Sequence, residues 1–473
     1  MRKTKIIATI GPASRNEEIL TKMISAGMNV ARLNFSHGTH EYHKETIDLI
    51  KKVRKEKEVP LGIMLDMKGP EVRTKSLSNG KVTLKKGAAF TLTSKDVLGD
   101  ENIVSITYPP LCKEVEKNTK ILIDDGSIEL CVLETTDDEI KCKVVRGGAL
   151  GEKKGINVPS VKLGMPYLSD TDKKDILFGI ENDVDFIAAS FVRTKNDVIQ
   201  LRKFVNYHGG HKIKIISKIE NTEGIDNFDE ILLNSDGIMV ARGDMGVEVD
   251  YTRLPGLQKR FIKKCYRSGK MVITATQMLE SMIKNPTPTR AEITDVANAV
   301  FDGTSAVMLS GETAMGNYPV ESVEVMANIS QQAEDDCFDM DIYSRRSYDL
   351  DIEDTTNAIC DAARTTATDL RAKAIIALTM GGDTARNVSK FRPSMPIVAA
   401  TPEEKTFHQL SLSWGVCPVL SLYKNHSDDL FVHAIDCAKN LDIVEKNDMV
   451  VIIVGIPLEI SGNTNTIKVA KVK

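Results

Sequence analysis

The sequence, 473 residues long, has little of what marks several large classes of protein. It contains one tryptophan, only 5% aromatic residues and a formal net charge of −4. Proteins that bind nucleic acids usually present a basic patch, so this composition gives no support to a polyanionic partner. No apolar run approaches the roughly 20 residues that a membrane-spanning helix needs. We therefore expect neither a nucleic acid nor a membrane as a partner.

Cysteine pairs at metal-binding spacing are also missing. The eight cysteines are scattered and none forms a C-x-x-C pair, which argues against a zinc site or a disulfide scaffold. We expect free thiols in a reducing compartment. The apolar run after the basic start ends at Gly11-Pro12, too early for the core of a secretory signal peptide. These features favour a cytoplasmic location.

Eight short apolar runs predict the strands of a parallel sheet. They cover residues 5–10, 29–35, 61–67, 184–191, 212–220, 236–242, 270–276 and 305–311. Helical periodicity follows each run except the third, whose helix is expected late, at 172–180. Buried parallel strands with helical crossovers, eight times over, predict a (β/α)8 TIM barrel.

Two further segments have a different pattern. From 70 to 164, short runs with period-two alternation are separated by Gly, Asp and Asn turns, which predicts an all-β module inserted after the third strand as a lid. From 344 to 473, strands alternate with helices, which predicts an open α/β sheet. We therefore predict a barrel domain (1–69 and 165–343), a β-barrel lid domain (70–164) and a C-terminal α/β domain (344–473).

Polar residues follow the predicted barrel strands, on the face where such barrels form their active sites. Seven strand ends carry them: Arg32, Asn34 and Ser36; Asp66; Ser190 and Arg193; Lys218 and Glu220; Arg242 and Asp244; Thr276; Ser310 and Glu312. Each alone could be an ordinary residue at the start of a loop. Together they would face one small mouth, which we interpret as an active site.

Lys218 and Glu220 are two residues apart on one strand and therefore share a face. A buried ion pair would explain them, but such a pair is weak evidence of stability. Glu220 and Asp244 lie on neighbouring strands and suit Mg²⁺ or Mn²⁺, which is commonly held by one or two carboxylates. The backbone N–H groups of "ARGDMGVE" and cationic donors around the metal suit a substrate that carries phosphate and carboxylate. The expected cations are Arg32, Arg193, Arg242 and Lys218.

Other features of the sequence do not indicate a further functional site. The P-loop pattern G-x-x-x-x-G-K-[ST] is absent. The histidines His37, His40 and His43 hint at a metal, but they lack thiolate or carboxylate partners at ligand spacing, so zinc is disfavoured. The stretch "NPTPTRAE" is explained by a capped helix start, with Thr289 as N-cap and Glu292 three residues on.

Seven motifs occur in order along the chain: "TKIIATIGPAS", "NVARLNFSHG", "LDMKGPEVRT", "SKIEN", "MVARGDMGVE", "TATQMLESM" and "NPTPTRAEITDVANAVFDGTSAVMLSGETAMGNYPV". Together they resemble the pyruvate kinase family. The resemblance implies a barrel with a β lid and a C-terminal α/β domain. It also implies a phosphotransferase of the last step of glycolysis, which converts phosphoenolpyruvate and ADP to pyruvate and ATP with Mg²⁺ and K⁺. A homotetramer is the assembly that it implies.

The resemblance further implies roles for single residues. Glu220 and Asp244 would hold Mg²⁺, while Lys218 and Arg32 would neutralise the phosphoryl group during transfer. Thr276 and the backbone at Gly243 and Asp244 would receive the substrate carboxylate. Thr276, Ser310 and a water are one route for protonating the enolate, and the proton donor stays open.

It implies two more sites around the mouth and one in the C-terminal domain. K⁺ would be held by Asn34, Ser36, Asp66 and the carbonyl of Met67, where the family commonly has Thr, with Glu71 as the acidic residue of a K⁺-dependent motif. Nucleotide phosphates would contact Asn34, His37, Arg73 and Lys154. A loop similar to the family's site for a phosphorylated effector contains Thr379, Gly381, Gly382, Asp383 and Thr384. Because Gly381 replaces a commonly seen Ser and Asp383 adds an anion, an ordinary strand-to-helix turn stays open.

Two alternative functions also stay open. A Mg²⁺-dependent lyase or aldolase on the same barrel would need the metal carboxylates, but neither the lid nor the K⁺ site. A catalytically silent metabolite sensor would keep the binding residues without turnover. The identity of an effector and the preferred nucleoside diphosphate stay open as well.

Overall fold

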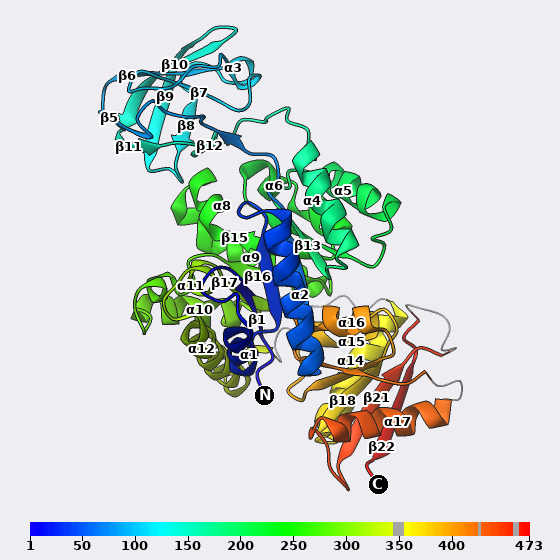
Figure 1. Cartoon of the computed structure of the whole chain (residues 1–473). Helices are drawn as coiled ribbons and strands as arrows, with labels where there is room; N and C mark the ends of the chain where they lie inside the picture. Colours follow the sequence, from blue (N-terminus) through cyan, green and yellow to red (C-terminus); the bar gives the residue numbers. More distant parts are fainter. Residues whose placement is uncertain (344–353, 424–426, 457–462) are drawn as a thin grey trace.

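The computed structural model of the chain describes residues 1–343, 354–423, 427–456 and 463–473 (Figure 1). A barrel of strands and helices lies in the middle of the molecule. An all-β unit, coloured cyan, stands over one end of the barrel, and a layered α/β unit, coloured yellow to red, lies against the other end.

Eight parallel strands close the barrel in the order β1-β17-β16-β15-β14-β13-β3-β2. They are β1 (Lys5–Thr9), β2 (Val30–Asn34), β3 (Gly62–Asp66), β13 (Phe186–Ala189), β14 (Lys214–Ile219), β15 (Gly237–Ala241), β16 (Met271–Ala275) and β17 (Ala306–Leu309). Nearly every residue of these strands is buried, because side chains on one face fill the barrel and those on the other pack under helices. The predicted TIM barrel is confirmed.

Helices cover the barrel, and several of them begin at a residue whose side chain caps the first turn. They are α1 (Glu17–Ala26), α2 (His40–Glu56), α4 (Asp170–Glu181), α5 (Lys195–Tyr207), α7 (Phe228–Asn234), α9 (Leu254–Arg267), α10 (Arg290–Asp302) and α12 (Pro319–Asp339). Ser169 with Asp172 and Thr289 with Glu292 form reciprocal capping boxes, each side-chain cap contributing about 1 kcal/mol. The capped start expected at Thr289 and the late helix of the third strand are both confirmed.

The all-β unit follows β3 and has a hydrophobic core of its own around Phe90, Leu92 and Ile121. Its main sheet has the order β4-β12-β8-β9-β10-β6-β7, and β11 pairs with β5. The strands are β4 (Val72–Arg73), β5 (Lys81–Leu84), β6 (Ala89–Thr93), β7 (Ile103–Ser105), β8 (Lys120–Ile123), β9 (Ile128–Thr135), β10 (Glu139–Arg146), β11 (Gly148–Gly151) and β12 (Gly155–Asn157). One short helix, α3 (Leu111–Glu114), interrupts them.

The C-terminal unit is a five-stranded sheet in the order β20-β19-β18-β21-β22, in which only β22 is antiparallel to its neighbour. Its strands are β18 (Ala374–Leu378), β19 (Ile397–Thr401), β20 (Val416–Leu420), β21 (Met449–Val454) and β22 (Thr466–Lys471). Helices α14 (Thr355–Asp369), α15 (Asp383–Lys390), α16 (Glu404–Gln409) and α17 (Ser427–Asn440) accompany them. The open α/β sheet is confirmed, while the boundary predicted at residue 344 lies outside the described residues.

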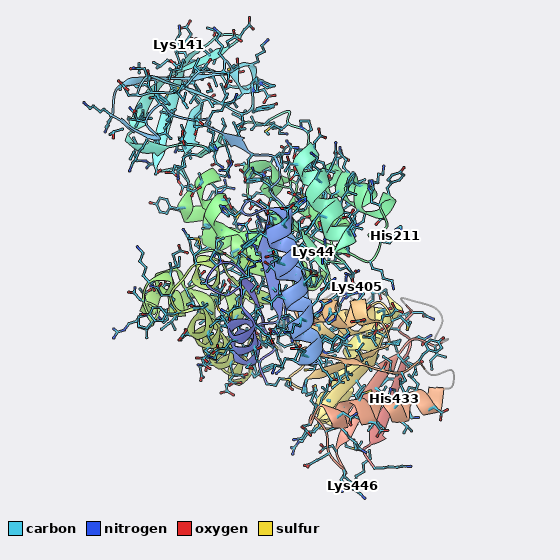
Figure 2. All side chains as sticks on the ribbon, viewed as in Figure 1. Lys44, Lys141, His211, Lys405, His433 and Lys446 are labelled. Atoms are coloured by element: carbon cyan, nitrogen blue, oxygen red, sulfur yellow. The ribbon has the colours of Figure 1, made fainter. Side chains whose placement is uncertain are left out.

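Buried charges join the barrel to the C-terminal unit. Asp185, just before β13, lies 3.1 Å from the guanidinium of Arg54 and 3.2 Å from Nζ of Lys405. Lys405 also lies 2.7 Å from Asp183, and its position at the junction is labelled in Figure 2. The side chains of Lys405 and Asp185 are 11% and 1% exposed, so this ion pair is buried at the junction of the two units.

All eight cysteines are free thiols, as predicted. Among the helices of the described residues, none combines the length and the apolar character needed to cross a bilayer.

Candidate active site

Lys218, near the end of β14, is the centre of a buried charge cluster at the barrel mouth. Its Nζ lies 3.2 Å from Asp66 Oδ1 and 3.0 Å from Glu220 Oε1, and it donates a 2.7 Å hydrogen bond to Ser190 Oγ. The lysine is only 9% exposed. Burial alone would lower the pKa of Lys218, but Asp66 and Glu220 outweigh it and raise the pKa above its ordinary value. The ammonium is therefore charged at neutral pH.

Arg32, in β2, shares Asp66 with Lys218. Its Nε lies 2.6 Å from Asp66 Oδ2, and its Nη1 donates to Thr9 Oγ1 at 2.8 Å. Burial raises the pKa of Asp66, but Lys218 and Arg32 together bring it below its usual value. One ionised carboxylate thus holds two cations at the mouth, each with capacity to meet a further anion.

Glu220 is 1% exposed and follows β14 directly. Its Oε2 accepts a 2.6 Å hydrogen bond from the backbone N–H of Phe191, whereas its Oε1 has no hydrogen bond despite lying near Lys218. Burial raises the pKa of Glu220 to about 7, and Asp244 contributes to the rise while Lys218 opposes it. A buried carboxylate oxygen without a hydrogen bond is expensive, and a metal ion is one partner that would satisfy it.

Asp244 lies in the first turn of α8 (Arg242–Glu248), the short helix that follows β15. Because β14 and β15 are paired neighbours, Glu220 and Asp244 emerge side by side from the barrel. Their hard oxygen ligands suit Mg²⁺ or Mn²⁺. Across the described part of the chain, no group of three or more His, Cys, Asp or Glu is arranged to hold a metal.

Two of the three histidines that hint at a metal, His40 and His43, have other partners. His40 Nε2 lies 2.6 Å from Asp175 Oδ1, and His43 Nε2 lies 2.8 Å from the carbonyl of His37. The ring of His43 stacks on Phe35 with a centroid distance of 4.0 Å. These contacts explain His40 and His43 as packing residues, while His37 is exposed.

Thr276, just after β16, has a strained backbone with φ of 67°. A β-branched residue in this region is a genuine outlier that costs about 1–3 kcal/mol and is typical of functional sites. Its Oγ1 accepts a 2.8 Å hydrogen bond from Gly243 N, which ties it to the start of α8. The strain therefore holds a hydroxyl beside the backbone of Gly243 and Asp244.

Arg242 supports this strained turn instead of facing the mouth. Its Nη2 donates to the carbonyl of Thr276 at 2.7 Å, and its Nη1 lies 2.7 Å from Asp295 Oδ1. Our expectation that Arg242 adds a cation around the metal is therefore wrong. Arg193 likewise donates to the carbonyls of Leu163 and Met165 at 2.9 Å each, where the chain returns from the lid.

Ser310 follows β17, beside β16, and its backbone N–H donates to Glu312 Oε2 at 2.7 Å. Glu312 also accepts a 3.1 Å hydrogen bond from Leu279 N and is 1% exposed. Glu312 therefore organises two loops. Ser310 remains half-buried at the mouth.

The residues expected around K⁺ lie at the ends of β2 and β3. Asn34 and Asp66 are direct partners in the register of these strands, and Asn34 Oδ1 accepts a 3.1 Å hydrogen bond from Ser36 N. Met67 N donates to the carbonyl of Ala188 at 3.0 Å, and Met67 is buried. The four residues are close in the fold, but both oxygens of Asp66 already contact cations.

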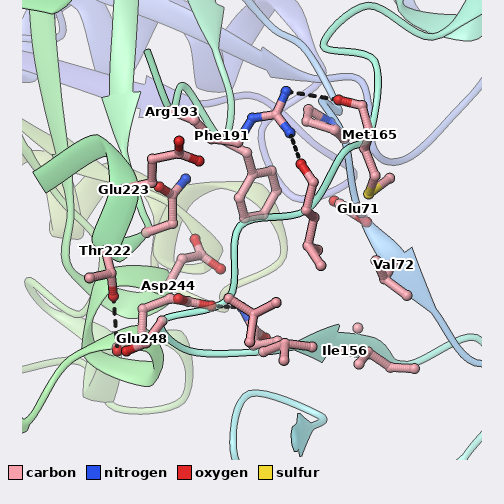
Figure 3. Close-up of a pocket in the computed structure, with 18 of the residues that line it drawn as sticks. Glu71, Val72, Ile156, Met165, Phe191, Arg193, Thr222, Glu223, Asp244 and Glu248 are labelled. Carbon is pink, nitrogen blue, oxygen red and sulfur yellow. Dashed lines mark hydrogen bonds between the residues drawn. The ribbon is translucent and has the colours of Figure 1, made fainter. Parts of the chain in front are cut away.

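A pocket of about 540 Å³ opens between the lid and the barrel mouth (Figure 3). This volume is typical of a small-ligand site. The lid lines it with Arg73, Asp124, Asp125, Lys154 and Asn157, and the barrel with Phe191, Arg193, Asn221, Asp244 and Glu248. The predicted nucleotide residues Arg73 and Lys154 thus share a pocket with the predicted metal ligand Asp244, whereas His37 is not among the lining residues.

Within the lid, the cations of this pocket are held by acidic neighbours. Lys154 Nζ lies 2.9 Å from Asp124 Oδ1, and Arg73 pairs with Glu71 and donates to the carbonyl of Lys153 at 2.8 Å. The sequence interpretation missed Asp124, Asp125, Asn157 and Glu248. The pair "DD" in "ILIDDGS" was a signal for the first two, although it is equally typical of a hairpin turn.

The loop expected to bind an effector phosphate begins α15. Gly382 has φ of 88°, and its N–H donates to Thr379 Oγ1 at 2.9 Å. Arg386 lies 2.8 Å from Asp383 and also bonds the carbonyl of Gly381. Thr384 bonds Thr464 at 3.0 Å. The stretch "GIPLEISGNTNT", which resembles a second loop of the family's effector pocket, includes residues 457–462, which lie outside the described residues.

Comparisons with known proteins agree with this architecture. The family pattern "Pyruvate kinase, barrel domain" matches residues 1–323, and "Pyruvate kinase, alpha/beta domain" matches residues 357–470. The chain is 48% identical over 475 residues to a pyruvate kinase of Clostridium acetobutylicum, covering 100% of both chains. It is 48% identical to one of Staphylococcus haemolyticus, covering 99% of this chain and 80% of that one. A crystal structure of a pyruvate kinase from Cryptosporidium parvum is 42% identical, with a TM-score of 0.94 and coverage of 100% and 96%.

Proposed function

Because the chain belongs to the pyruvate kinase family, we propose that its barrel mouth transfers the phosphoryl group of phosphoenolpyruvate to ADP with Lys218 and Arg32 as the stabilising cations. The activity is that of a phosphotransferase of glycolysis that yields pyruvate and ATP. Phosphoryl transfer asks little covalent chemistry of the protein, and its catalysis consists mostly of positioning and electrostatic stabilisation.

The observation that carries the proposal is the shared carboxylate of Asp66. It holds the Arg32 guanidinium and the Lys218 ammonium, both about nine-tenths buried, at one edge of the mouth. In a site so poorly hydrated, fixed cations act strongly on a group whose charge is spread over three oxygens. The two side chains can therefore stabilise the phosphoryl group in transit without reorganising, and Lys218 can also steady the enolate left behind.

We propose that Glu220 and Asp244 hold Mg²⁺ or Mn²⁺. The Glu220 oxygen without a hydrogen bond and the neighbouring strands of the two carboxylates support this assignment. When bound, the ion would neutralise charge and orient the substrate's carboxylate and enol oxygen. For K⁺ we propose Asn34, Ser36, Asp66 and the carbonyl of Met67, with Glu71 as the residue whose charge the ion balances.

Thr276 and the backbone of Gly243 and Asp244 are proposed to receive the substrate carboxylate. The strained turn at Thr276 and its hydrogen bond from Gly243 support this role, because they fix the hydroxyl at the start of α8, beside the backbone of Asp244. Ser310 at the end of the adjacent strand would join Thr276 and a water in protonating the enolate.

The nucleotide is proposed to bind in the pocket between barrel and lid, where Arg73 and Lys154 would contact its phosphates. Asn34 and His37 are further candidates at the rim of the mouth. We also propose the domain division 1–69 with 165–343, 70–164 and 344–473, a cytoplasmic location and a homotetramer. For the loop at Thr379 to Thr384, the ion pair of Asp383 with Arg386 favours an ordinary turn over an effector phosphate site.

An assay that detects pyruvate tests the proposal. We expect pyruvate from phosphoenolpyruvate only when ADP is present, loss of the activity when Mg²⁺ is chelated, and a much weaker rate when Na⁺ replaces K⁺. Pyruvate formed without ADP would favour the lyase alternative. Binding of phosphoenolpyruvate without any turnover would favour the metabolite sensor.

A further inference from the structure

The lid contacts the barrel at α8, the helix that also carries the proposed metal ligand Asp244. Asn157, at the end of β12, donates through Nδ2 to Glu248 Oε1 at 3.1 Å. Glu248 is the last residue of α8, and Asp244 lies one turn before it. The two hydrogen-bonding residues are 91 positions apart in the sequence, so the contact joins the lid to the barrel mouth.

The turn between β8 and β9 also approaches this helix, at the residue before Glu248. Gly126, in the turn between β8 and β9, has φ of 78°, and a Cβ atom built there would lie 3.6 Å from Val247 Cγ1. A methyl group added at Gly126 would therefore meet Val247 at ordinary van der Waals distance, so the turn lies close to α8. The turn carries Asp124 and Asp125, which line the pocket.

Two like charges face the pocket from this turn and from α8. Asp125 and Asp244 face the same pocket with like charges, and burial, followed by Asp244, raises the pKa of Asp125. Lys154 and Arg73 oppose this repulsion, and a further attractive contact would help to hold the lid against the helix. The hydrogen bond from Asn157 is such a contact, and its carboxylate acceptor makes it stronger than a neutral one.

We propose that Glu248 is a positioning residue that latches β12 to α8 and thereby sets the lid's cations opposite Asp244. Lys154 precedes Asn157 by three residues, about 10 Å along an extended chain. Arg73 is the register partner of Gly155, so β12 also carries Arg73 with it. Glu248 acts through these residues, and the inference rests on the proposal that the nucleotide binds in this pocket.

Steady-state kinetics of the full chain test the latch. We expect Asn157→Ala and Glu248→Ala each to raise the KM for ADP about tenfold, the effect of losing one charge-assisted hydrogen bond, with little change in the KM for phosphoenolpyruvate. Glu248→Gln keeps an acceptor oxygen and should stay within about threefold of the parent protein. The double variant should be no worse than either single alanine variant, because both remove the same contact.

Asp96→Asn is the matched control, because Asp96 pairs with Lys75 at 3.0 Å on the exposed surface of the lid. It should leave every constant unchanged. Additive effects in the double variant, or an equal rise in the KM for ADP in Asp96→Asn, would overturn the latch.

Amide hydrogen exchange without substrates supplies a readout that needs no activity. Exchange at 124–126 and 155–157 should be about tenfold faster in Glu248→Ala and unchanged in Glu248→Gln. Unchanged exchange in Glu248→Ala would refute the latch. A parent protein without ADP-dependent turnover would refute the proposed function, and the exchange result would still decide whether Glu248 holds the lid.

Discussion

Replacing Lys218 by methionine removes one charge from the buried cluster while keeping an unbranched side chain of similar length. At about 3 Å and an effective dielectric constant of about 20, a cation and a unit of developing negative charge attract by about 5 kcal/mol. At 1.36 kcal/mol per factor of ten, this corresponds to a loss of about 10³- to 10⁴-fold in kcat. Arg32 remains, so phosphoenolpyruvate should still bind.

Lys218→Met should also affect stability, and this effect must be separated from catalysis. The variant leaves Asp66 and Glu220 without their shared cation, and breaking a buried ion pair costs about 3–5 kcal/mol. Lys405→Met is a matched control, because the Lys405 side chain is likewise 11% exposed and contacts two carboxylates, Asp183 and Asp185. It should lower the melting temperature similarly and leave kcat nearly unchanged.

Three measurements decide this prediction: kcat, the Kd for phosphoenolpyruvate and the melting temperature of each variant. The reasoning is refuted if Lys218→Met keeps its kcat, or if Lys405→Met loses as much.

Three further predictions concern residues around the cluster. The pKa of Glu220 is about 7 in the fold and 4.5 in the unfolded chain, so the folded state binds more protons between these pH values. The metal-free protein should therefore lose up to about 3 kcal/mol of unfolding free energy as the pH rises from 4.5 to 7. Glu220→Gln should remove this loss, which urea unfolding in EDTA at pH 4.5 and 7.5 would detect; an equal slope in both proteins would contradict the assignment. Thr276→Val keeps the branched shape but removes the hydroxyl, so the KM for phosphoenolpyruvate should rise about tenfold, and an unchanged value would exclude the hydroxyl from carboxylate binding. Arg242→Lys breaks the guanidinium contacts to Asp295 and the Thr276 carbonyl, so kcat should fall about tenfold although Arg242 touches no substrate, and full activity would show that the turn holds without it.

The fold could be predicted because its pattern is local. Strands such as Met271–Ala275 are apolar on both faces, which only a covered parallel sheet requires, and the capping box at Thr289 marks a helix start within four residues. The lid was recognisable because alternation such as that of Glu139–Arg146 belongs to a sheet with one solvated face. These signals need no knowledge of distant partners.

The site was predicted less completely, because its geometry depends on contacts between distant residues. Lys218 and Arg242 are both cations at strand ends, yet Lys218 faces the mouth while Arg242 is drawn beneath the loop by Asp295, 53 positions away. Asn157 and Glu248 carry no motif at all and acquire meaning only when the lid lies on α8. Asp66 likewise contacts both Arg32 and Lys218 because β2, β3 and β14 end at the same mouth, and no single segment of the sequence shows this.

The most direct test of the central claim is a ³¹P NMR time course of the parent protein with phosphoenolpyruvate, ADP, Mg²⁺ and K⁺. We predict that the phosphoenolpyruvate signal falls at the same rate as the γ-phosphate signal of ATP rises, and that neither changes without ADP. Growth of inorganic phosphate in place of the γ-phosphate signal would contradict phosphoryl transfer at this mouth.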